Sequence, residues 1–583
     1  MGTISDKLMR IINTKEDIRQ ALISKGYDVP TSIPFKEYAK MILDLPCNAD
    51  SFPDIEGIVA RYSASGLTNE QMAANPVWAD KTGNGRDLQL KNFSWKRMSG
   101  VGGYVQDFND FRNNATVDKI RIDEQSSNSI KVTILTTGIS NTIYIPKNIY
   151  QFNKSYFIKI SSEGYDEGDM ALSFYAPSTS TATTVTVSLN PNGITEIPAI
   201  KEDDFLAVYI NVSGKVGSFT VEQLPLYPGA LVFDGVDDYG VCENFPILTK
   251  EKGYTVVALR QWDQDFLNTT LTGGLLSTRN YSTGEGVAFE KIESSNKGYW
   301  NLGAGGIIDF AKSPFTWQTS KQYNNVGILK GDKNHGKPLC VGCGLSGGQQ
   351  CGRFAIWELV FLDHDATEEE LTKIKDYFVK TYPWLFPDQA WTVTGKTNED
   401  EDRATIANIT GNGNDLVLSN FGFIEGSGYN KEGEYAGYLV TDGVDDKITS
   451  SIFEMGNDWT VIGDWELINT GKKDNAGIVK FDSIVIYNYN PILINIKNGR
   501  NNLIPDQNTV NAICSDGRIY SKDWKESIYN EETESTSKNF LTIGYSGNSY
   551  TKIAFKNLAI YPTVLSKEDC IKAYNYLQTL KAK

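Results

Sequence analysis

The pattern best suited to acid–base chemistry is Asp464-Trp465-Glu466. Residues two positions apart on a strand share a face, so Asp464 and Glu466 are the closest local match to the carboxylate pair of a glycosidase. A related segment earlier in the chain has Leu-Arg-Gln at the corresponding residues 259–261. Because the acidic pair is missing from one of two related segments, we expect a solvated strand face and assign no catalytic residue.

Soft metal ligands are scarce, since the chain has two histidines and seven scattered cysteines. An odd, dispersed set of cysteines argues against a disulfide framework, so most should be free thiols. The side chains that could supply the ligands of a zinc site are His335, Cys340, Cys343 and Cys351. If residues 339–343 form one strand, however, Cys340 and Cys343 face opposite sides and cannot share an ion. We expect no zinc there, and a Cys343–Cys351 contact across a hairpin stays open.

Two pairs of adjacent carboxylates, Asp237-Asp238 and Asp445-Asp446, occur at matched positions and could in principle bind calcium. Each follows an Asp-Gly-Val sequence that is typical of a turn leading into a strand. Neighbours on a strand point to opposite faces, so chelation would need a bend. The stronger interpretation is turn chemistry, and we expect no metal and no other cofactor.

Aromatic side chains offer a natural basis for sugar binding, because flat rings stack on pyranose faces. The chain has 11 Trp, 30 Tyr and 26 Phe, most of which must be core. Trp300 and Trp317 lie in Gly- and Ser-rich or polar surroundings, which makes them the candidates for exposed carbohydrate-binding platforms.

The elements that position these residues come from a duplication. Residues 82–93 and 410–421 share a Thr-Gly-Asn-Gly-x-Asp-Leu-x-Leu pattern and a closing Asn-Phe, with the glycines favouring tight turns. A second block, at 231–238 and 439–446, repeats Asp-Gly-Val-Asp-Asp in the same order. Between the two blocks the first copy carries roughly 120 more residues, which predicts an inserted domain.

Short β-prone runs separated by Gly, Asn and Asp are typical of antiparallel sandwiches. We expect a mainly β protein of tandem sandwiches, each closing with a strand and an amphipathic helix that starts at Thr367 or Ser566. The predicted domains are a first jelly roll (51–111 and 229–386), an inserted β-sandwich (112–228) and a second jelly roll (387–583).

Residues 1–50 read as short helices. Thr14 and Asp17 have N-cap spacing and Gly26 can end that helix, while Pro34 opens an apolar stripe. A segment this small buries too little surface to fold alone, so it should trimerise, dock on another protein, or pack on the next domain. The residues assigned to anchoring and oligomerisation are Leu8, Ile18, Leu22, Phe35, Tyr38 and Ile42.

The charge balance excludes some partners. A net charge of −16 repels nucleic acid and anionic membranes. No apolar run approaches the roughly 18 residues of a membrane span, and we expect no cleavable export signal.

The Thr-Gly-Asn-Gly block, the Phe-Asp-Gly-Val-Asp-Asp-Tyr block at 233–239 and the terminal strand and helix together resemble the concanavalin A-like, laminin-G-like jelly rolls. The resemblance covers about two thirds of the chain. It implies a two-sheet lectin-type sandwich, a fold that hosts sugar binding, protein adhesion and some glycosidases, so fold alone does not choose among them.

The N-terminal segment resembles a module at the start of phage fibre and decoration proteins, through Lys7-Leu8, Thr14-Lys15, Ile18, Ala21-Leu22 and Lys25-Gly26, with Phe35 and Tyr38 beyond. Joined to lectin-like domains, it is most similar to the head fibres of crAss-like phages. This resemblance implies a homotrimer made in the host cytoplasm, fixed to the capsid or another virion protein by its N-terminus and displayed on the outer surface of the particle.

Three functions remain after these considerations. The first is a structural virion fibre that adheres to host or mucus glycans, and it is the one we favour. The second is a polysaccharide-degrading tail fibre on the same fold, which the scarcity of catalytic residues disfavours. The third, a bacterial surface adhesin, is disfavoured by the expected lack of an export signal.

Overall fold

The computed structural model describes Lys15 and most of residues 52–582. The gaps are 114–117, 139–140, 178–182, 203–204, 249–251, 268, 279–287, 292–296, 301–306, 310–314, 320–337, 346–348, 434, 469–476, 482–483, 488–491, 497–499, 505–509, 522–523, 529–540 and 547–548. The anchoring residues predicted between Leu8 and Ile42 therefore lie outside the described residues. The described parts of 56–368 and 378–582 belong to one compact unit, and residues 52–55 with 369–377 belong to another.

The first jelly roll is built from two antiparallel sheets that enclose one hydrophobic core. Its first sheet has the strand order β22-β17-β26-β15-β4, with β1 also on β26. These strands are β1 (Ile58–Ser63), β4 (Gly100–Val101), β15 (Leu231–Asp234), β17 (Thr255–Trp262), β22 (Phe315–Thr319) and β26 (Arg353–Leu362). Buried side chains such as Tyr62, Phe233 and Leu359 fill the core between the sheets.

The second sheet of this jelly roll has the order β2-β3-β16-β23-β18-β19-β20-β21, with a β24–β25 hairpin at β18. Its strands are β2 (Val77–Trp78), β3 (Leu88–Lys91), β16 (Tyr239–Cys242), β18 (Gly273–Ser277), β19 (Ala288–Lys291), β20 (Lys297–Trp300), β21 (Ile307–Asp309), β23 (Leu339–Val341), β24 (Cys343–Leu345) and β25 (Gln349–Cys351). Two short helices, α3 (Asn69–Ala74) and α4 (Gln264–Leu267), lie in its connections.

The second jelly roll repeats the core strand order of the first, with two strands added to its first sheet and its hairpin separate from its second sheet. Its sheets have the orders β38-β33-β44-β31-β30, extended by β39 and β40 with β27 on β44, and β28-β29-β32-β41-β34-β35-β36-β37. The strands of the first sheet are β27 (Gln389–Thr392), β30 (Gly428–Tyr429), β31 (Leu439–Val440), β33 (Thr460–Leu467), β38 (Val510–Cys514), β39 (Arg518–Ser521), β40 (Glu526–Ile528) and β44 (Ile553–Tyr561). Those of the second are β28 (Thr405–Ile406), β29 (Leu416–Ser419), β32 (Lys447–Thr449), β34 (Gly477–Phe481), β35 (Ile484–Tyr487), β36 (Ile492–Ile496), β37 (Arg500–Ile504) and β41 (Thr542–Ile543), with a separate hairpin of β42 (Tyr545–Ser546) and β43 (Ser549–Tyr550). The predicted tandem architecture is confirmed.

The glycine-rich blocks form the same turn in both copies. Gly83 and Gly411 have φ angles of 77° and 82°, which favour glycine over residues with a Cβ. In each copy the next residue is an asparagine whose side-chain amide donates to a backbone carbonyl at or near the first strand. Asn84 Nδ2 donates to the Val59 carbonyl at 3.1 Å, and Asn412 Nδ2 donates to the Asp388 carbonyl at 2.8 Å. The repeated letters therefore encode a structural turn.

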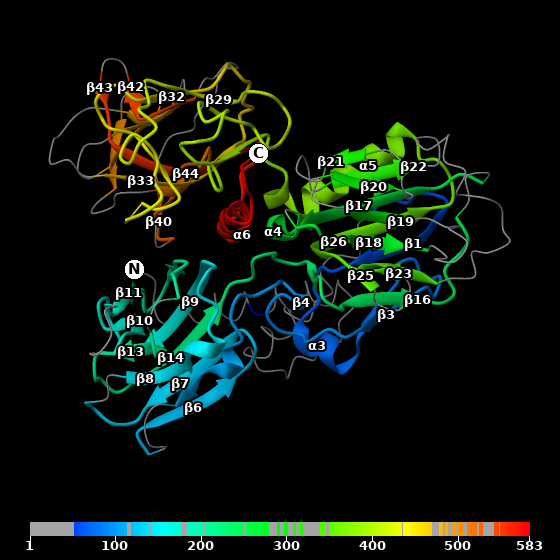
Figure 1. The fold of residues 1–583 in the computed structure, drawn as a ribbon, viewed down its shortest axis with the longest axis horizontal. Coiled ribbons are helices and arrows are strands. Elements are labelled where there is room, and N and C mark those ends of the chain that lie inside the picture. The colour runs from blue at the N-terminus through cyan, green and yellow to red at the C-terminus, as the bar shows by residue number, and fades with distance from the viewer. Residues whose placement is uncertain are drawn as a thin grey trace. The chain divides into compact units, whose positions relative to one another are not determined.

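The inserted domain is a sandwich of two five-stranded antiparallel sheets with its own core (Figure 1). The first sheet has the order β11-β10-β13-β8-β5 and the second β12-β9-β14-β7-β6. The strands are β5 (Arg112–Asn113), β6 (Ile120–Gln125), β7 (Ser129–Ile134), β8 (Asn141–Pro146), β9 (Tyr156–Glu163), β10 (Met170–Tyr175), β11 (Val185–Leu189), β12 (Ile194–Ile197), β13 (Ala207–Val212) and β14 (Gly217–Gln223). Period-two alternation accounts for these strands, because Ile, Val and Phe side chains point inward at every second position.

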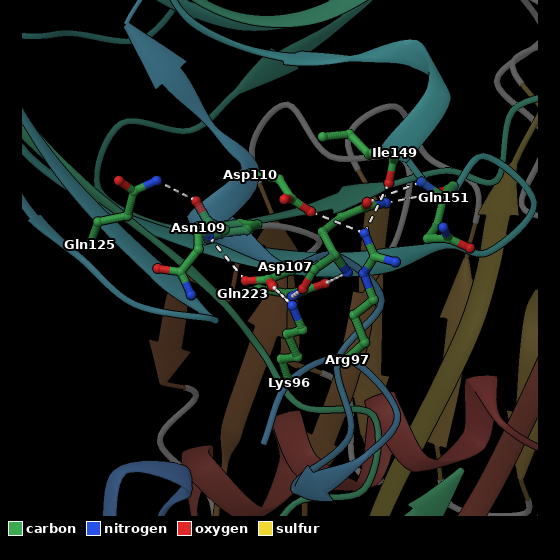
Figure 2. A network of polar contacts seen from close by, with 11 residues as sticks. Lys96, Arg97, Asp107, Asn109, Asp110, Gln125, Ile149, Gln151 and Gln223 are labelled. Carbon is green, nitrogen blue, oxygen red and sulfur yellow. Dashed lines mark hydrogen bonds and ion pairs between the residues drawn. The ribbon is translucent and has the colours of Figure 1, made fainter. Parts of the chain in front are cut away.

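A polar network lies where the chain enters and leaves the inserted domain (Figure 2). Lys96 Nζ lies 3.2 Å from the buried carboxylate of Asp107, and Arg97 Nη2 donates to Asp110 at 3.0 Å and to the Ile149 carbonyl at 3.1 Å. These contacts tie the base of the inserted domain to the turn that precedes it.

The same network satisfies backbone groups at the base of the inserted domain. Gln223 Oε1 accepts from the backbone N–H groups of Val105 and Gln106, and its Nε2 donates to the Gln106 carbonyl at 3.0 Å. The Gln106 side chain in turn exchanges two hydrogen bonds with the backbone of Gln151, at 2.9 and 3.1 Å. Buried amide side chains thus pair backbone groups where the ladders end.

Each jelly roll ends in the predicted strand and helix. The helices are α5 (Glu368–Thr381) and α6 (Lys567–Gln578). Ser566 caps α6 by accepting from the Asp569 N–H at 3.1 Å, as its spacing predicted. In the smaller unit, the ring of Phe52 meets that of Tyr377 on α5 edge-on at 4.9 Å. Among the helices that the structure describes, none has the length and apolar character needed to span a membrane.

Candidate functional site

The outward face of the first sheet in the inserted domain carries a continuous row of side chains across all five strands. Strand register places Arg112 opposite Tyr144, Tyr144 opposite Tyr209, Tyr209 opposite Ser173 and Ser173 opposite Thr186. Their strand neighbours, such as Ile143, Ile210 and Leu172, point into the core, so alternation turns this row outward.

Three tyrosines cluster on this face, which we call the tyrosine face (outward residues of β5, β8, β13, β10 and β11). The rings of Tyr144 and Tyr209 are nearly parallel, at 29°, with centroids 5.7 Å apart. Tyr175 meets Tyr209 edge-on at 6.0 Å and is 44% exposed. Burial raises the pKa of Tyr209, and the other two tyrosines add to this shift, so its hydroxyl stays protonated.

Hydrogen-bonding groups lie beside the rings. Ser173 Oγ accepts from Asn211 Nδ2 at 2.8 Å and lies 3.2 Å from Thr186 Oγ1. The Oδ1 atom of Asn211 is buried and has no hydrogen-bond partner among the residues that the structure describes. The tyrosine face thus combines aromatic surface with an amide and hydroxyls, which is the side-chain set that recognises a polyhydroxylated ligand.

The two outer faces of the inserted sandwich differ in charge. The outward residues of β8, β13, β10 and β11 are uncharged, and the one charged side chain of the row is the exposed Arg112 at its edge. The other sheet carries Lys131 beside Glu124, and exposed Lys159. A solvated sheet face is usually charged in the second manner, so the tyrosine face has the composition of a contact surface.

The predicted sugar platforms, Trp300 and Trp317, lie in strands β20 and β22. Register places Trp300 opposite Phe289 and Trp317 opposite Val257. Their side chains lie outside the described residues, so their role as platforms stays a prediction.

Asp464 is the centre of a polar cluster beneath α6. Its carboxylate accepts from Tyr438 Oη and Gln578 Nε2, each at 3.0 Å, and lies 3.5 Å from Lys556 Nζ. Nearby Asp464 raises the pKa of Lys556 against the opposing effect of burial, so the ammonium form is retained. These contacts give Asp464 a structural role in seating α6 on β33 and β44.

The strand register also tests the alignment of this segment with residues 259–261. Leu259 faces Glu358 and Asp464 faces Asn557, at the same point in each sheet and beside the same bulge. The correspondence inferred from sequence is therefore correct, and an acidic pair is present in the second copy alone.

The adjacent carboxylates belong to turns, as their sequence indicated. Asp234 Oδ1 accepts from the Val236 N–H at 2.8 Å, and Asp238 Oδ2 accepts from the Asp234 N–H at 3.1 Å. The other oxygen of Asp238 accepts from Ser99 at 3.0 Å. Asp442, Asp445 and Asp446 repeat the arrangement, and in each copy the three carboxylates approach within 4.8 Å. The turn itself accounts for the acidic residues.

One expectation about the cysteines is wrong. Cys340 and Cys343 do not face opposite sides, since they form a disulfide with a Cα–Cα distance of 6.2 Å. The physical reason is Gly342, whose φ of 99° ends β23 and starts β24, so residues 339–343 are not one strand. A Cβ at this position would lie 2.6 Å from the Phe233 ring and 2.7 Å from the Asp238 carbonyl.

The tyrosine face is the feature that sequence reasoning missed. The runs around β8 and β13 alternate, and Tyr144 and Tyr209 occupy the outward phase of that alternation. Reading the phase together with the polar neighbours Asn211 and Ser173 would have pointed to this face. The pairing of β8 with β13, which brings the rings together, is not encoded in either run alone.

The sequence matches no protein-family profile and no curated protein. Among solved structures, the chain is similar to a botulinum neurotoxin serotype D binding domain at 10% identity, covering 59% of this chain and 89% of that one, with a TM-score of 0.23. It is also similar to Trypanosoma rangeli sialidase in complex with the inhibitor DANA at 8% identity, covering 77% and 82%, with a TM-score of 0.25. At these scores neither similarity carries an argument about ligand or activity.

Proposed function

We propose that this protein is an adhesive, glycan-binding β-sandwich protein, and that the tyrosine face is its binding surface. The observation that carries the proposal is the cluster of Tyr144, Tyr209 and Tyr175 on a sheet face whose one charged residue in the row is Arg112 at its edge. Aromatic rings cover the apolar faces of sugars, and the neighbouring hydroxyls and amide match sugar hydroxyls.

The shape of the row suits an extended ligand. Neighbouring strands are about 4.8 Å apart, so the five-strand row from Arg112 to Thr186 spans roughly 19 Å. A short oligosaccharide running across the strands would meet Tyr144, Tyr209 and, beyond the buried Ser173, the exposed Thr186. Arg112 at one end would meet a carboxylate if the ligand carries an acidic sugar.

We further propose that the protein is a virion fibre on the outer surface of a phage particle, made in the host cytoplasm. The support is the resemblance of residues 1–50 to the N-terminal module of phage fibres, together with a tandem lectin-like architecture. In this proposal the N-terminus trimerises and attaches to a capsid or other virion protein, and the sandwiches contact host or mucus glycans.

The glycan proposal is tested with the full chain on a panel of bacterial and mucin polysaccharides, followed by titration calorimetry. Tyr144→Ala and Tyr175→Ala should each weaken binding several-fold, because an aromatic contact contributes about 0.5–1.5 kcal/mol beyond the area it buries. Lys159→Ala, on the charged face of the same domain, is the matched control and should bind as the unmodified chain does. Equal affinity of all variants would exclude the tyrosine face.

The same incubations separate binding from degradation. A binding protein leaves the polysaccharide intact, whereas a depolymerase produces new reducing ends. The appearance of reducing ends would favour the enzymatic alternative, and its first test would be Asp464→Asn.

A further inference from the structure

Three cysteines of the first jelly roll meet in one buried cluster. Cys340 in the middle of β23 and Cys343 at the start of β24 are disulfide-bonded, and Cys351 on β25 belongs to the same cluster as a thiol. The half-buried ring of Tyr239 packs against them. Three sulfur atoms with one disulfide among them allow more than one bonding pattern.

Cys343 and Cys351 are direct partners across the β24–β25 hairpin. Opposite residues in an antiparallel pair have Cβ atoms about 4.5–5.5 Å apart, and the short end of this range meets the long end of the roughly 3.5–4.5 Å found in disulfides. The second jelly roll shows that these two positions touch. There the corresponding partners are Tyr545 and Tyr550, whose ring centroids are 4.9 Å apart.

We infer that Cys343 is the shared partner of two alternative disulfides, with Cys340 or with Cys351, and that this corner is a thiol–disulfide exchange site. In the exchange the Cys351 thiolate attacks Cys343 Sγ. The Cys343–Cys351 bond forms, the Cys340–Cys343 bond breaks, and Cys340 leaves as a thiolate that takes up the proton. One disulfide is lost and one is gained, so no external oxidant is needed.

The two bonding patterns connect different elements. The Cys340–Cys343 bond closes the corner between β23 and β24, whereas Cys343–Cys351 would cross-link the β24–β25 hairpin. The exchange leaves the register of β24 and β25 unchanged, because Cys343 and Cys351 already face each other. Exchange therefore moves the disulfide from the β23–β24 junction to the β24–β25 hairpin without a change of fold.

The surroundings of Cys351 determine the rate of the exchange. Burial, with the carboxylates of Asp234, Asp237 and Asp238 adding to it, raises the pKa of Cys351 to about 12. The thiolate is therefore scarce at neutral pH, and exchange should be slow there and roughly tenfold faster for each unit of rising pH.

The test replaces Cys340 in the full chain by the residue at the corresponding position of the second jelly roll, Thr542. Cys340→Thr, reduced and then equilibrated in an oxidised and reduced glutathione buffer, should form a Cys343–Cys351 disulfide, detected by peptide mapping with mass spectrometry. Cys351→Ala in the same buffer should form Cys340–Cys343 and serves as the matched control.

The unmodified chain supplies the second measurement. Held under non-reducing conditions, it should yield more Cys343–Cys351 peptide at pH 9 than at pH 7 over the same time. If Cys343 and Cys351 of Cys340→Thr both stay alkylatable in the buffer in which the control becomes oxidised, the inference is overturned.

Discussion

A buried ion pair in the first jelly roll leads to a prediction for which the second jelly roll serves as the internal control. Arg61 Nε and Nη2 donate to Glu358 at 3.2 and 3.4 Å, and Tyr382 Oη donates to the same carboxylate at 2.8 Å. Both charged side chains are buried, at 4% and 0% exposure. Strand register shows that Ala390 and Asn557 occupy the corresponding positions, so the second copy has neither charge.

Removing one charge should cost far more than removing both. Arg61→Ala leaves the Glu358 carboxylate buried without its cation, which costs about 3–5 kcal/mol. The double variant Arg61→Ala/Glu358→Asn reproduces the second copy and should recover much of this loss, because no charge stays buried. At about 1.4 kcal/mol for each factor of ten, the single variant should raise the equilibrium constant for local opening by roughly 10²- to 4 × 10³-fold.

Hydrogen-exchange mass spectrometry of the full chain measures this opening directly, since a multidomain chain has no single unfolding free energy. Peptides from β26 should exchange faster in Arg61→Ala and more slowly again in the double variant. Peptides from β44 are the internal control and should not change. If the double variant opens as readily as the single variant, the pairwise argument is refuted.

Two further predictions concern the carboxyl group of Asp238 and the glycines Gly342 and Gly83, all in the first jelly roll. Burial and the adjacent Asp234 raise the pKa of Asp238 to about 7, so the folded state holds this proton more tightly than the unfolded state does. Its contribution to the free energy of unfolding is therefore full below about pH 4 and is lost by about pH 7. Asp238→Asn should flatten this decline in thermal unfolding between about pH 4 and 7. Gly342→Ala should destabilise the first jelly roll by well over 1 kcal/mol, because its Cβ would lie 2.6 Å from the Phe233 ring, whereas Gly83→Ala, with a similar positive φ and nothing within 4 Å of its Cβ, should cost about 1 kcal/mol. Equal melting temperatures for the two glycine variants would contradict the steric argument.

Local signals in the sequence account for much of the fold. The repeated Thr-Gly-Asn-Gly letters predict the turns at Gly83 and Gly411, because that backbone conformation favours glycine. Ser566 predicts the start of α6, and alternation predicts the strands of the inserted domain. Each of these signals lies within a few residues of the structure that it specifies.

The candidate sites depend on contacts that no local pattern contains. Arg61 and Glu358 are 297 residues apart, and nothing near either residue reveals its partner. Tyr144 and Tyr209 meet because β8 pairs with β13 in a particular register. The Cys340–Cys343 bond depends on Gly342, which divides an apparently continuous β-prone run. The sequence alone does not show why a glycine is needed there, because the reason is the close approach of the Phe233 ring.

The position of the inserted domain has an evolutionary consequence. It leaves the first jelly roll between β4 and β15, which pair with each other as their equivalents β30 and β31 do across a short loop in the second copy. The two connecting strands are also hydrogen-bonded, from the Gly102 N–H to the Ala230 carbonyl at 2.8 Å. The inserted domain is thus joined to the tip of the β4–β15 hairpin. The two chain ends lie close together there, so an insertion costs little stability. An insertion at such a position leaves the pairing of β4 with β15 in the host sandwich intact, so the module could be replaced by another without loss of a host strand.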